Sequence, residues 1–151
     1  MAEADPQPHV IVAGFGVPGR AVVETLHEAR VSYCIVELNR STVERCERFG
    51  EHIIEGDASE AETLRRAGIE RATMIVIAIP NEQAALATTK LARLLNPQVH
   101  IITRCHFVSK GLEAKLAGAN EVIIEEQAVA RELTAVLQAN LRGKDGLPRD
   151  S

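Results

Sequence analysis

The stretch HVIVAGFGVPGR, residues 9–20, decides the fold of this chain. An apolar run ends at Ala13, three glycines follow at G-x-G-x-x-G spacing, and an amphipathic stretch begins at once. The first glycine permits a tight turn, the second lets a diphosphate approach the backbone, and the third lets a helix pack closely on the strand. The helix then directs its free N–H groups and positive dipole end at the anion. We therefore predict a phosphate-binding loop made of Gly14, Phe15, Gly16, Val17, Pro18 and Gly19.

Strand-like and helix-like segments alternate along the rest of the chain. Apolar runs rich in β-branched residues occupy residues 10–13, 33–36, 52–54, 74–79, 99–103 and 122–124. The segments between them have helical periodicity. Apolar strands separated by helices are typical of a parallel sheet covered on both faces. The pattern predicts a doubly wound, Rossmann-like α/β fold with strand order 3-2-1-4-5-6 and a ligand at the carboxyl edge where that order reverses.

Capping residues indicate where the helices begin and end. Two pairs have capping-box spacing at predicted helix starts, Ser41 with Glu44 and Ser59 with Glu62. Three glycines lie where helices should end: Gly50, Gly68 and Gly118. Asn81 can cap a long helix, which Asn96-Pro97 terminates.

Length and composition restrict the function. The 151 residues suit one domain, placed at 9–141 between a flexible segment at 1–8 and a disordered tail at 142–151. Aromatic residues make up 3% and the net charge is −4, which argues against a nucleic-acid partner. Three widely separated cysteines are typical of reduced intracellular thiols, and the longest apolar runs are too short to span a bilayer. We expect a cytoplasmic location, although the chain could be a piece of a membrane protein.

The last predicted helix, residues 125–141, has two interpretations. Val129, Leu133, Val136 and Leu137 form an apolar stripe at helical spacing. The stripe either covers the sheet of its own domain or leaves the body and docks on a second subunit.

Glu37 ends the second predicted strand and lies 23 positions after Gly14. This separation is close to the roughly 20 residues of the dinucleotide fingerprint. A carboxylate there accepts hydrogen bonds from both ribose hydroxyls of an adenosine and repels a 2′-phosphate. We therefore assign Glu37, with its neighbours Leu38 and Asn39, to the ribose side of the site.

The loops after the third, fourth and fifth strands complete the predicted site. Gly56, Asp57 and Ala58 pass beside the expected adenine, although Asp57 could equally be a turn or capping residue. Ile79 and Pro80 close over the other side of the phosphates. Arg104 ends the fifth strand, where a guanidinium can hold phosphate oxygens. The histidines have no metal-ligand spacing. Cys105, beside Arg104, could have a lowered thiol pKa or be simply packed.

A dehydrogenase needs a proton donor or acceptor beside its nicotinamide. The only tyrosine, Tyr33, lies in a strand and has Glu37, not lysine, four residues on. The chain thus offers a nucleotide pocket without evident chemistry to serve it. This favours a sensor whose ligand shifts a conformational or assembly equilibrium, and it leaves a small NAD-dependent oxidoreductase or a redox sensor as the alternative.

Residues 9–141 resemble the RCK-N (KTN, TrkA-N) domains, the cytosolic regulators of potassium channels and of Trk, Ktr and Kef transport systems. The resemblance rests on stretches at residues 12–20, 36–37, 56–59, 64–69, 103–104 and 118–123. Ile79-Pro80-Asn81 and Asn96-Pro97 are most similar to the Kef-type branch. Val17 stands where many relatives have Arg, and Ala84 where many have Asn. The usual smaller C-terminal ligand domain is missing.

The resemblance implies an adenine nucleotide, NAD(H) or AMP, ADP or ATP, on the glycine loop, with Glu37 on the ribose and Asp57-Ala58 near adenine. It also implies a homodimer or larger ring paired through the final helix. The expected partner is a membrane potassium channel or transporter, fused or separate, and the expected place is the inner face of the membrane.

Overall fold

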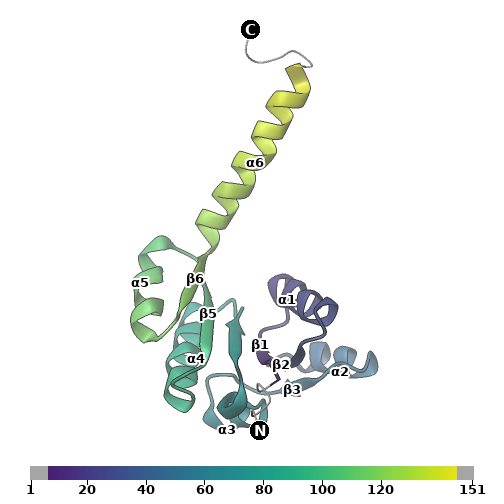
Figure 1. Ribbon diagram of the computed structural model, residues 1–151, viewed down its shortest axis with the longest axis vertical. Helices are drawn as coiled ribbons and strands as arrows, with labels where there is room; N and C mark the ends of the chain where they lie inside the picture. Colours follow the sequence, from purple (N-terminus) through teal and green to yellow (C-terminus); the bar gives the residue numbers. More distant parts are fainter. Residues whose placement is uncertain (1–6, 146–151) are drawn as a thin grey trace, which may run out of the picture.

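The computed structural model describes residues 7–145, and within them strands and helices alternate as predicted (Figure 1). The strands are β1 (His9–Ala13), β2 (Ser32–Glu37), β3 (Ile53–Glu55), β4 (Met74–Ile77), β5 (His100–Cys105) and β6 (Glu121–Ile124). The α-helices are α1 (Val17–Glu28), α2 (Arg40–Arg48), α3 (Ala61–Arg66), α4 (Glu82–Leu95), α5 (Val108–Ala117) and α6 (Glu125–Asp145). A 3-10 turn, η1, covers Ile69–Arg71. Residues 1–6 of the predicted flexible segment lie outside the described part.

All strand pairs in the sheet are parallel, and the order is β3-β2-β1-β4-β5-β6. This confirms the predicted Rossmann-like topology. The chain leaves β1 toward β2 on one side and returns beside β1 as β4 on the other. The strand order therefore reverses between β1 and β4, and the connections that follow these two strands lead in opposite directions from the carboxyl edge of the sheet.

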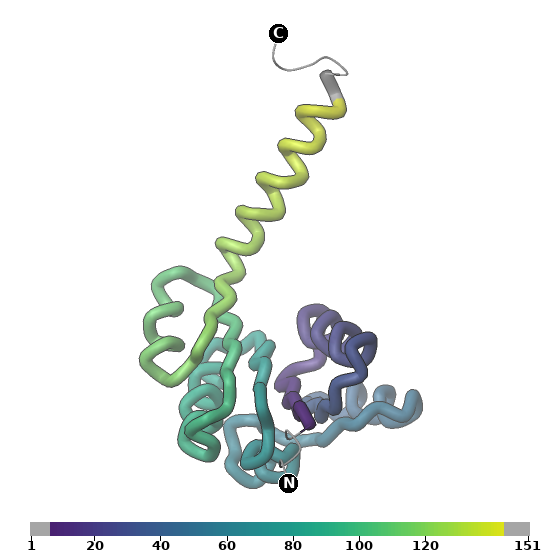
Figure 2. Tube along the Cα trace, viewed as in Figure 1, coloured from purple at the N-terminus to yellow at the C-terminus, as the bar shows by residue number. Residues whose placement is uncertain are grey.

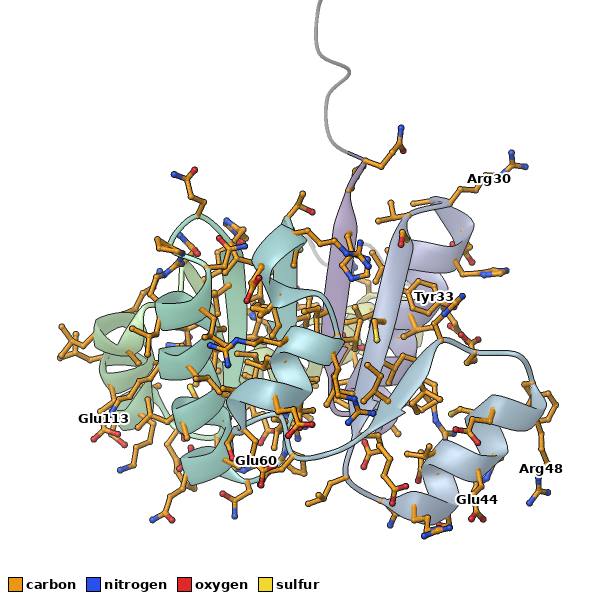
Figure 3. The ribbon with its side chains drawn as sticks, turned by 90° about the horizontal axis from the view of Figure 1, so that it is seen from below. Arg30, Tyr33, Glu44, Arg48, Glu60 and Glu113 are labelled. Atoms are coloured by element: carbon orange, nitrogen blue, oxygen red, sulfur yellow. The ribbon has the colours of Figure 1, made fainter. Side chains whose placement is uncertain are left out.

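The sheet is buried on both faces around β1, because successive strand residues point to opposite sides. Ile11 and Ala13 belong to the core cluster that includes residues of α3, α4 and α5. Val10 and Val12 pack with Val23 of α1 on the other face. Charged side chains such as Glu44, Arg48 and Glu113 point outward around this core (Figure 3).

The helix ends confirm some predicted caps and correct others. The Asn81 side chain caps α4 by accepting from the Ala84 N–H at 2.9 Å, and Asn96 ends that helix. The predicted capping boxes are wrong. Asn39, not Ser41, caps α2, because it is the last residue before the helix in extended conformation and its side-chain oxygen accepts from the Thr42 N–H at 3.1 Å. Ser59 is held by Asp57 at 2.6 Å instead of capping α3.

Arg93 joins the ends of three elements and was missed by sequence reasoning. Its guanidinium donates to the carbonyl oxygens of Val99 at 2.8 Å and Gly118 at 2.9 Å, and to Asn120 Oδ1 at 2.7 Å. An isolated arginine gives no sign of such partners, since all of them lie beyond the end of its own helix. Arg93 thus fixes the end of α4 to the strand and helix that follow.

Helix α6 projects from the body, as Figures 1 and 2 show. Every residue from Val129 to Gly143 is exposed, so of the two interpretations the one in which this helix covers its own sheet is wrong. The helix runs to Asp145 and so includes residues 142–145 of the predicted tail, whereas 146–151 lie outside the described part. Among residues 7–145, no helix has both the length and the apolar character required to cross a bilayer.

Candidate functional site

A cavity of about 590 Å³ opens at the carboxyl edge of the sheet, where the strand order reverses. Nine predicted site residues line it: Gly14, Glu37, Leu38, Asn39, Gly56, Asp57, Ala58, Ile79 and Pro80. The lining also includes three residues that we did not assign to the site: Val36, Asn81 and Ala84. Val36 and Asn81 adjoin the assigned residues Glu37 and Pro80 and could have been found as their neighbours, whereas Ala84 lies in the first turn of α4. The loops meet here because parallel strands end at one edge.

The three glycines differ in what surrounds them. Gly14 has φ +97°, and a Cβ there would approach the carbonyl of Ala78 to 3.0 Å. A Cβ on Gly19 would overlap the carbonyl oxygen of Gly14 and lie 2.9 Å from its carbonyl carbon. At Gly16 the nearest atom would be 4.0 Å away, so the space beside this backbone is open. The turn and packing roles of Gly14 and Gly19 are therefore built into the structure.

The Glu37 carboxylate is held in a fixed position beside the cavity. Its Oε2 accepts from the Phe15 N–H at 2.8 Å, and its Oε1 accepts from the Asn39 N–H at 3.1 Å. These bonds connect the end of β2 to the glycine loop across 22 residues of sequence. A carboxylate oxygen has two lone-pair sites, so each can still accept from a hydroxyl. Glu37 can therefore receive a vicinal diol without repositioning.

Three helices begin around the cavity, and their first turns differ. The side chains of Asn39 and Asn81 cap α2 and α4. Helix α1 instead begins at Gly16 without a side-chain cap and without an acidic residue in its first turn. Its first N–H groups and its positive dipole end are left for an anion.

Asp57 has the local role that we left open. Its Oδ1 accepts from the N–H of Ser59 at 2.8 Å and from its hydroxyl at 2.6 Å. These bonds hold the pKa of Asp57 below its usual value, and burial opposes them only in part. The ionised side chain forms the turn and also lines the cavity, which is compatible with both earlier interpretations.

Six predicted site residues are outside the cavity lining: Phe15, Gly16, Val17, Pro18, Gly19 and Arg104. Phe15 and Gly16 belong to the turn that leads into α1, and Val17, Pro18 and Gly19 form the first turn of that helix. The Phe15 N–H is taken by Glu37, and its ring lies beneath the Arg20 guanidinium, 5.5 Å from the ring centre. Sequence spacing could place this loop near the phosphates but could not say which of its amides remain available.

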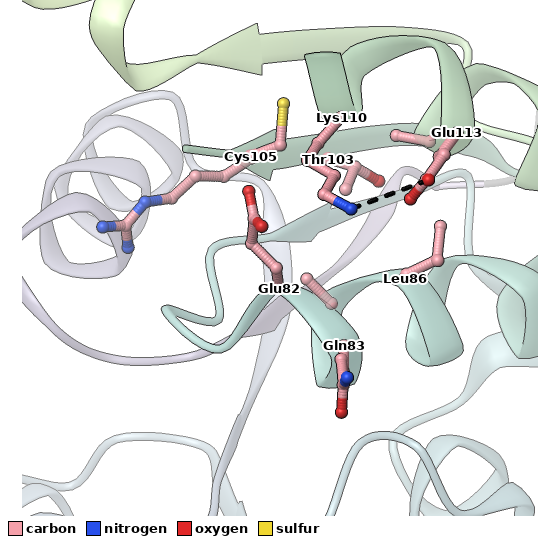
Figure 4. A pocket seen from close by; sticks show the side chains of 10 residues that line it. Glu82, Gln83, Leu86, Thr103, Cys105, Lys110 and Glu113 are labelled. Carbon is pink, nitrogen blue, oxygen red and sulfur yellow. Dashed lines mark ion pairs between the residues drawn. The ribbon is translucent and has the colours of Figure 1, made fainter. Parts of the chain in front are cut away.

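Arg104 is placed differently from the prediction. Its guanidinium pairs with the Glu125 carboxylate and donates to the Ala78 carbonyl oxygen at 3.1 Å. The physical reason is the acidic start of α6, which lies beside the end of β5. Arg104 lines a separate cavity of about 170 Å³ between α4 and α5. Figure 4 shows that cavity with the Lys110–Glu113 ion pair beside it.

The cysteines do not have the electrostatic surroundings of reactive thiols. Burial raises the pKa of Cys34, Cys46 and Cys105, and the carboxylates of Glu82 and Glu125 raise that of Cys105 further. The suggestion of a lowered Cys105 pKa is therefore wrong. Among residues 7–145, no group of three His, Cys, Asp or Glu side chains has a metal-binding arrangement.

Comparisons with known proteins relate the chain to one family of domains. The TrkA-N domain family matches residues 10–125. The glutathione-regulated potassium-efflux system protein KefC of Cronobacter sakazakii is 33% identical over 112 residues, which are 74% of this chain and 18% of the relative. The chain spans about a fifth of the length of the curated relatives it matches.

Two solved structures have the same fold. The TrkA-N domain of the Escherichia coli inner membrane protein YbaL is 28% identical, with a TM-score of 0.82 over 89% of this chain and 99% of that one. The Shewanella denitrificans Kef CTD, solved in an AMP-bound form, is 26% identical, with a TM-score of 0.72 over 87% and 80%.

Proposed function

Because the chain belongs to the TrkA-N domain family, we propose that it is a regulatory domain that binds an adenine nucleotide in the cavity beside Glu37. The fixed Glu37 carboxylate carries the proposal, since it faces the same cavity as the turn from which the uncapped helix α1 begins. Glu37 would accept from the ribose hydroxyls and α1 would receive the phosphates. The adenine would lie against Asp57 and Ala58.

The partner proposed for this domain is a potassium or cation transporter. The support is the resemblance to the matching segment of a potassium-efflux protein and to the domain of an inner membrane protein. We place the nucleotide-binding domain at residues 9–141, next to the inner face of the membrane. A ligand with different affinities for two conformations of the domain would shift their populations and so regulate transport.

Calorimetry with AMP, ADP, ATP and NAD tests the proposal, together with mass spectrometry of any small molecule that co-purifies. We expect saturable binding of adenine nucleotides. NADP should bind at least about tenfold more weakly than NAD, because its 2′-phosphate meets the Glu37 carboxylate. Absorbance at 340 nm should reveal no hydride transfer across a substrate panel. Absence of binding by every nucleotide contradicts the proposal. Robust turnover that is lost on substitution of a cavity residue supports an oxidoreductase instead.

The exposed stripe on α6 supports a second proposal, that two copies of the chain pair through this helix. Val129, Leu133, Val136 and Leu137 are between 50% and 65% exposed on one side of the helix. Helix α5 presents another exposed apolar row: Val108, Leu112 and Leu116. A two-fold pair would let α6 of each copy cover such a surface of the other.

Leu133→Asp should convert the dimer to a monomer at micromolar concentration, because it places a charge at the centre of the stripe. Sedimentation equilibrium measures the change. Gln138→Asp is the matched control, since it introduces the same side chain on the opposite face of α6 and should leave the dimer intact. Wild-type protein that sediments as a monomer at 100 μM, as an order-of-magnitude limit for a stable pair, contradicts the pairing.

A further inference from the structure

Both ring nitrogens of His106 face hydrogen-bond acceptors. Nδ1 contacts the carboxylate of Glu125, and Nε2 lies 2.6 Å from the carbonyl oxygen of Pro80. A neutral imidazole carries one N–H and can donate to only one of these oxygens. The arrangement is satisfied when both nitrogens are protonated. The geometry therefore corresponds to a histidine cation between an acid and a backbone carbonyl.

The charges that surround this ring favour the cation. Glu125 of α6 pairs with the ring and with Arg104 of β5, and Glu82 of α4 accepts from the His106 N–H at 2.9 Å. Glu126 of α6 accepts from the Val108 N–H at 2.6 Å on the same side. The carboxylates of Glu125 and Glu82 thus raise the pKa of the ring, and Glu125 also pairs with Arg104. The hydrogen bond to Glu125 and then that to Pro80 raise the pKa of His106, and burial opposes them only in part.

The two acceptors of His106 belong to different functional parts of the molecule. Pro80 lines the proposed nucleotide cavity, in the loop between β4 and α4. Glu125 is the first residue of α6, whose side chains are exposed from Val129 to Gly143. Arg104 bridges the same two parts, since it contacts both Ala78 and Glu125. The first residue of α6 is thus connected, through His106 and Arg104, to the loop that lines the cavity.

We propose that doubly protonated His106 is a positioning residue that links the wall of the nucleotide cavity to α6. Protonation of His106, nucleotide occupancy and the orientation of α6 would then depend on one another. This inference rests on the proposed function, because it takes the occupant of the cavity to be a nucleotide.

The direction of the pH effect follows from the number of protons on the ring. At low pH both hydrogen bonds form and the Pro80 carbonyl is held in place, which preorganises the cavity. As pH rises through the pKa of His106, the ring loses one proton and one of the two bonds. Nucleotide affinity should then fall. By reciprocity, bound nucleotide should raise the pKa of His106.

Nuclear magnetic resonance of the nucleotide-free protein tests the link by itself. The ring of His106 should carry protons on both nitrogens at pH 6.5 and should titrate at a higher pH than ordinary histidine. Residual dipolar couplings of the α6 amides should report a changed helix orientation once the ring is neutral. A ring that is neutral at pH 6.5, or a helix orientation that does not follow its titration, overturns the proposal.

Calorimetry with AMP at pH 6.5 and pH 9 tests the coupling to nucleotide. For each protein the measured quantity is the pH ratio, the dissociation constant of AMP at pH 9 divided by that at pH 6.5. This ratio should be about fivefold larger for the wild type than for His106→Gln. The comparison with a variant cancels the titration of AMP itself. His100→Gln is the matched control, because His100 of β5 likewise pairs with a glutamate, Glu121 of β6, at 2.6 Å but is not among the residues that line the cavity.

The outcomes separate the two proposals. An equal pH ratio in wild type and His106→Gln overturns the coupling even where AMP binds tightly. Failure of AMP to bind at either pH contradicts the proposed function and the coupling with it, whereas the ring titration still decides whether His106 links the loop to α6. If the pH ratio of the AMP dissociation constants in His100→Gln also differs from that of the wild type, the pH effect arises from a general change of charge and the proposal is overturned.

Discussion

Gly19→Ala is expected to lower the free energy of unfolding by about 3 kcal/mol, the upper end of the usual cost of overpacking, because it forces a methyl group against the backbone. The added Cβ would overlap the carbonyl oxygen of Gly14, and the next nearest atom is the carbonyl carbon of the same residue at 2.9 Å. Neither atom can rotate away as a side chain could. The Gly14 backbone has little room to move away, because it packs closely beside the Ala78 carbonyl. Its N–H also donates to the Val36 carbonyl oxygen at 2.9 Å. Urea denaturation followed by circular dichroism measures the loss.

Gly16→Ala is the matched control for this substitution. It adds the same methyl group three residues away, where the nearest atom would be 4.0 Å distant and φ is −82°. Its effect on stability should stay below about 1 kcal/mol, the range of helix N-cap changes. Its effect on nucleotide affinity should be larger, because the methyl group occupies the space proposed for phosphate. Equal stability of Gly19→Ala and wild type would show that α1 does not approach the Gly14 turn so closely.

Glu37→Ala is expected to weaken AMP binding by about 1–3 kcal/mol, which is the scale for hydrogen bonds to a charged group. The expected increase in dissociation constant is therefore about 5- to 150-fold. Removal of the carboxylate takes away the proposed acceptors for both ribose hydroxyls. It also leaves the Phe15 and Asn39 amides without the partners that hold them at 2.8 Å and 3.1 Å. Isothermal calorimetry measures the affinity.

Two controls distinguish contact with the ribose from a disturbed loop. Glu55→Ala removes an exposed acid on β3 that lies opposite Glu37 in the strand register but does not line the cavity. The affinity of this variant for AMP should be unchanged. Replacing AMP by 2′-deoxy-AMP should weaken binding to the wild type and have little further effect on Glu37→Ala. Additive losses in the two changes would mean that Glu37 does not contact the ribose.

The strand order and most of the cavity lining could be predicted from the amino-acid sequence alone. Strand identity follows from apolar, β-branched runs, and the order is the one expected for a doubly wound fold whose glycine loop follows the first strand. Once the order is known, the residues after each strand must meet at one edge. Glu37, Asp57 and Pro80 were therefore placed together without any knowledge of their contacts. The helix caps show the limit of this reasoning: Ser41 and Asn39 are both good caps, and only backbone geometry selected Asn39.

The contacts of Arg104 and His106 and the exposure of α6 depend on the folded structure and could not be predicted from local sequence. The local sequence does not indicate whether an arginine at a strand end contacts a phosphate or an acidic side chain 21 residues further along the chain. The choice of Glu125 depends on β6 pairing beside β5, which brings the start of α6 to the end of that strand. The pairing of β4 with β5 makes neighbours of two other residues, Pro80 and His106, which follow the ends of these strands. An apolar stripe likewise predicts burial but not against which surface, because periodicity describes the faces of one helix and not the surface that covers them.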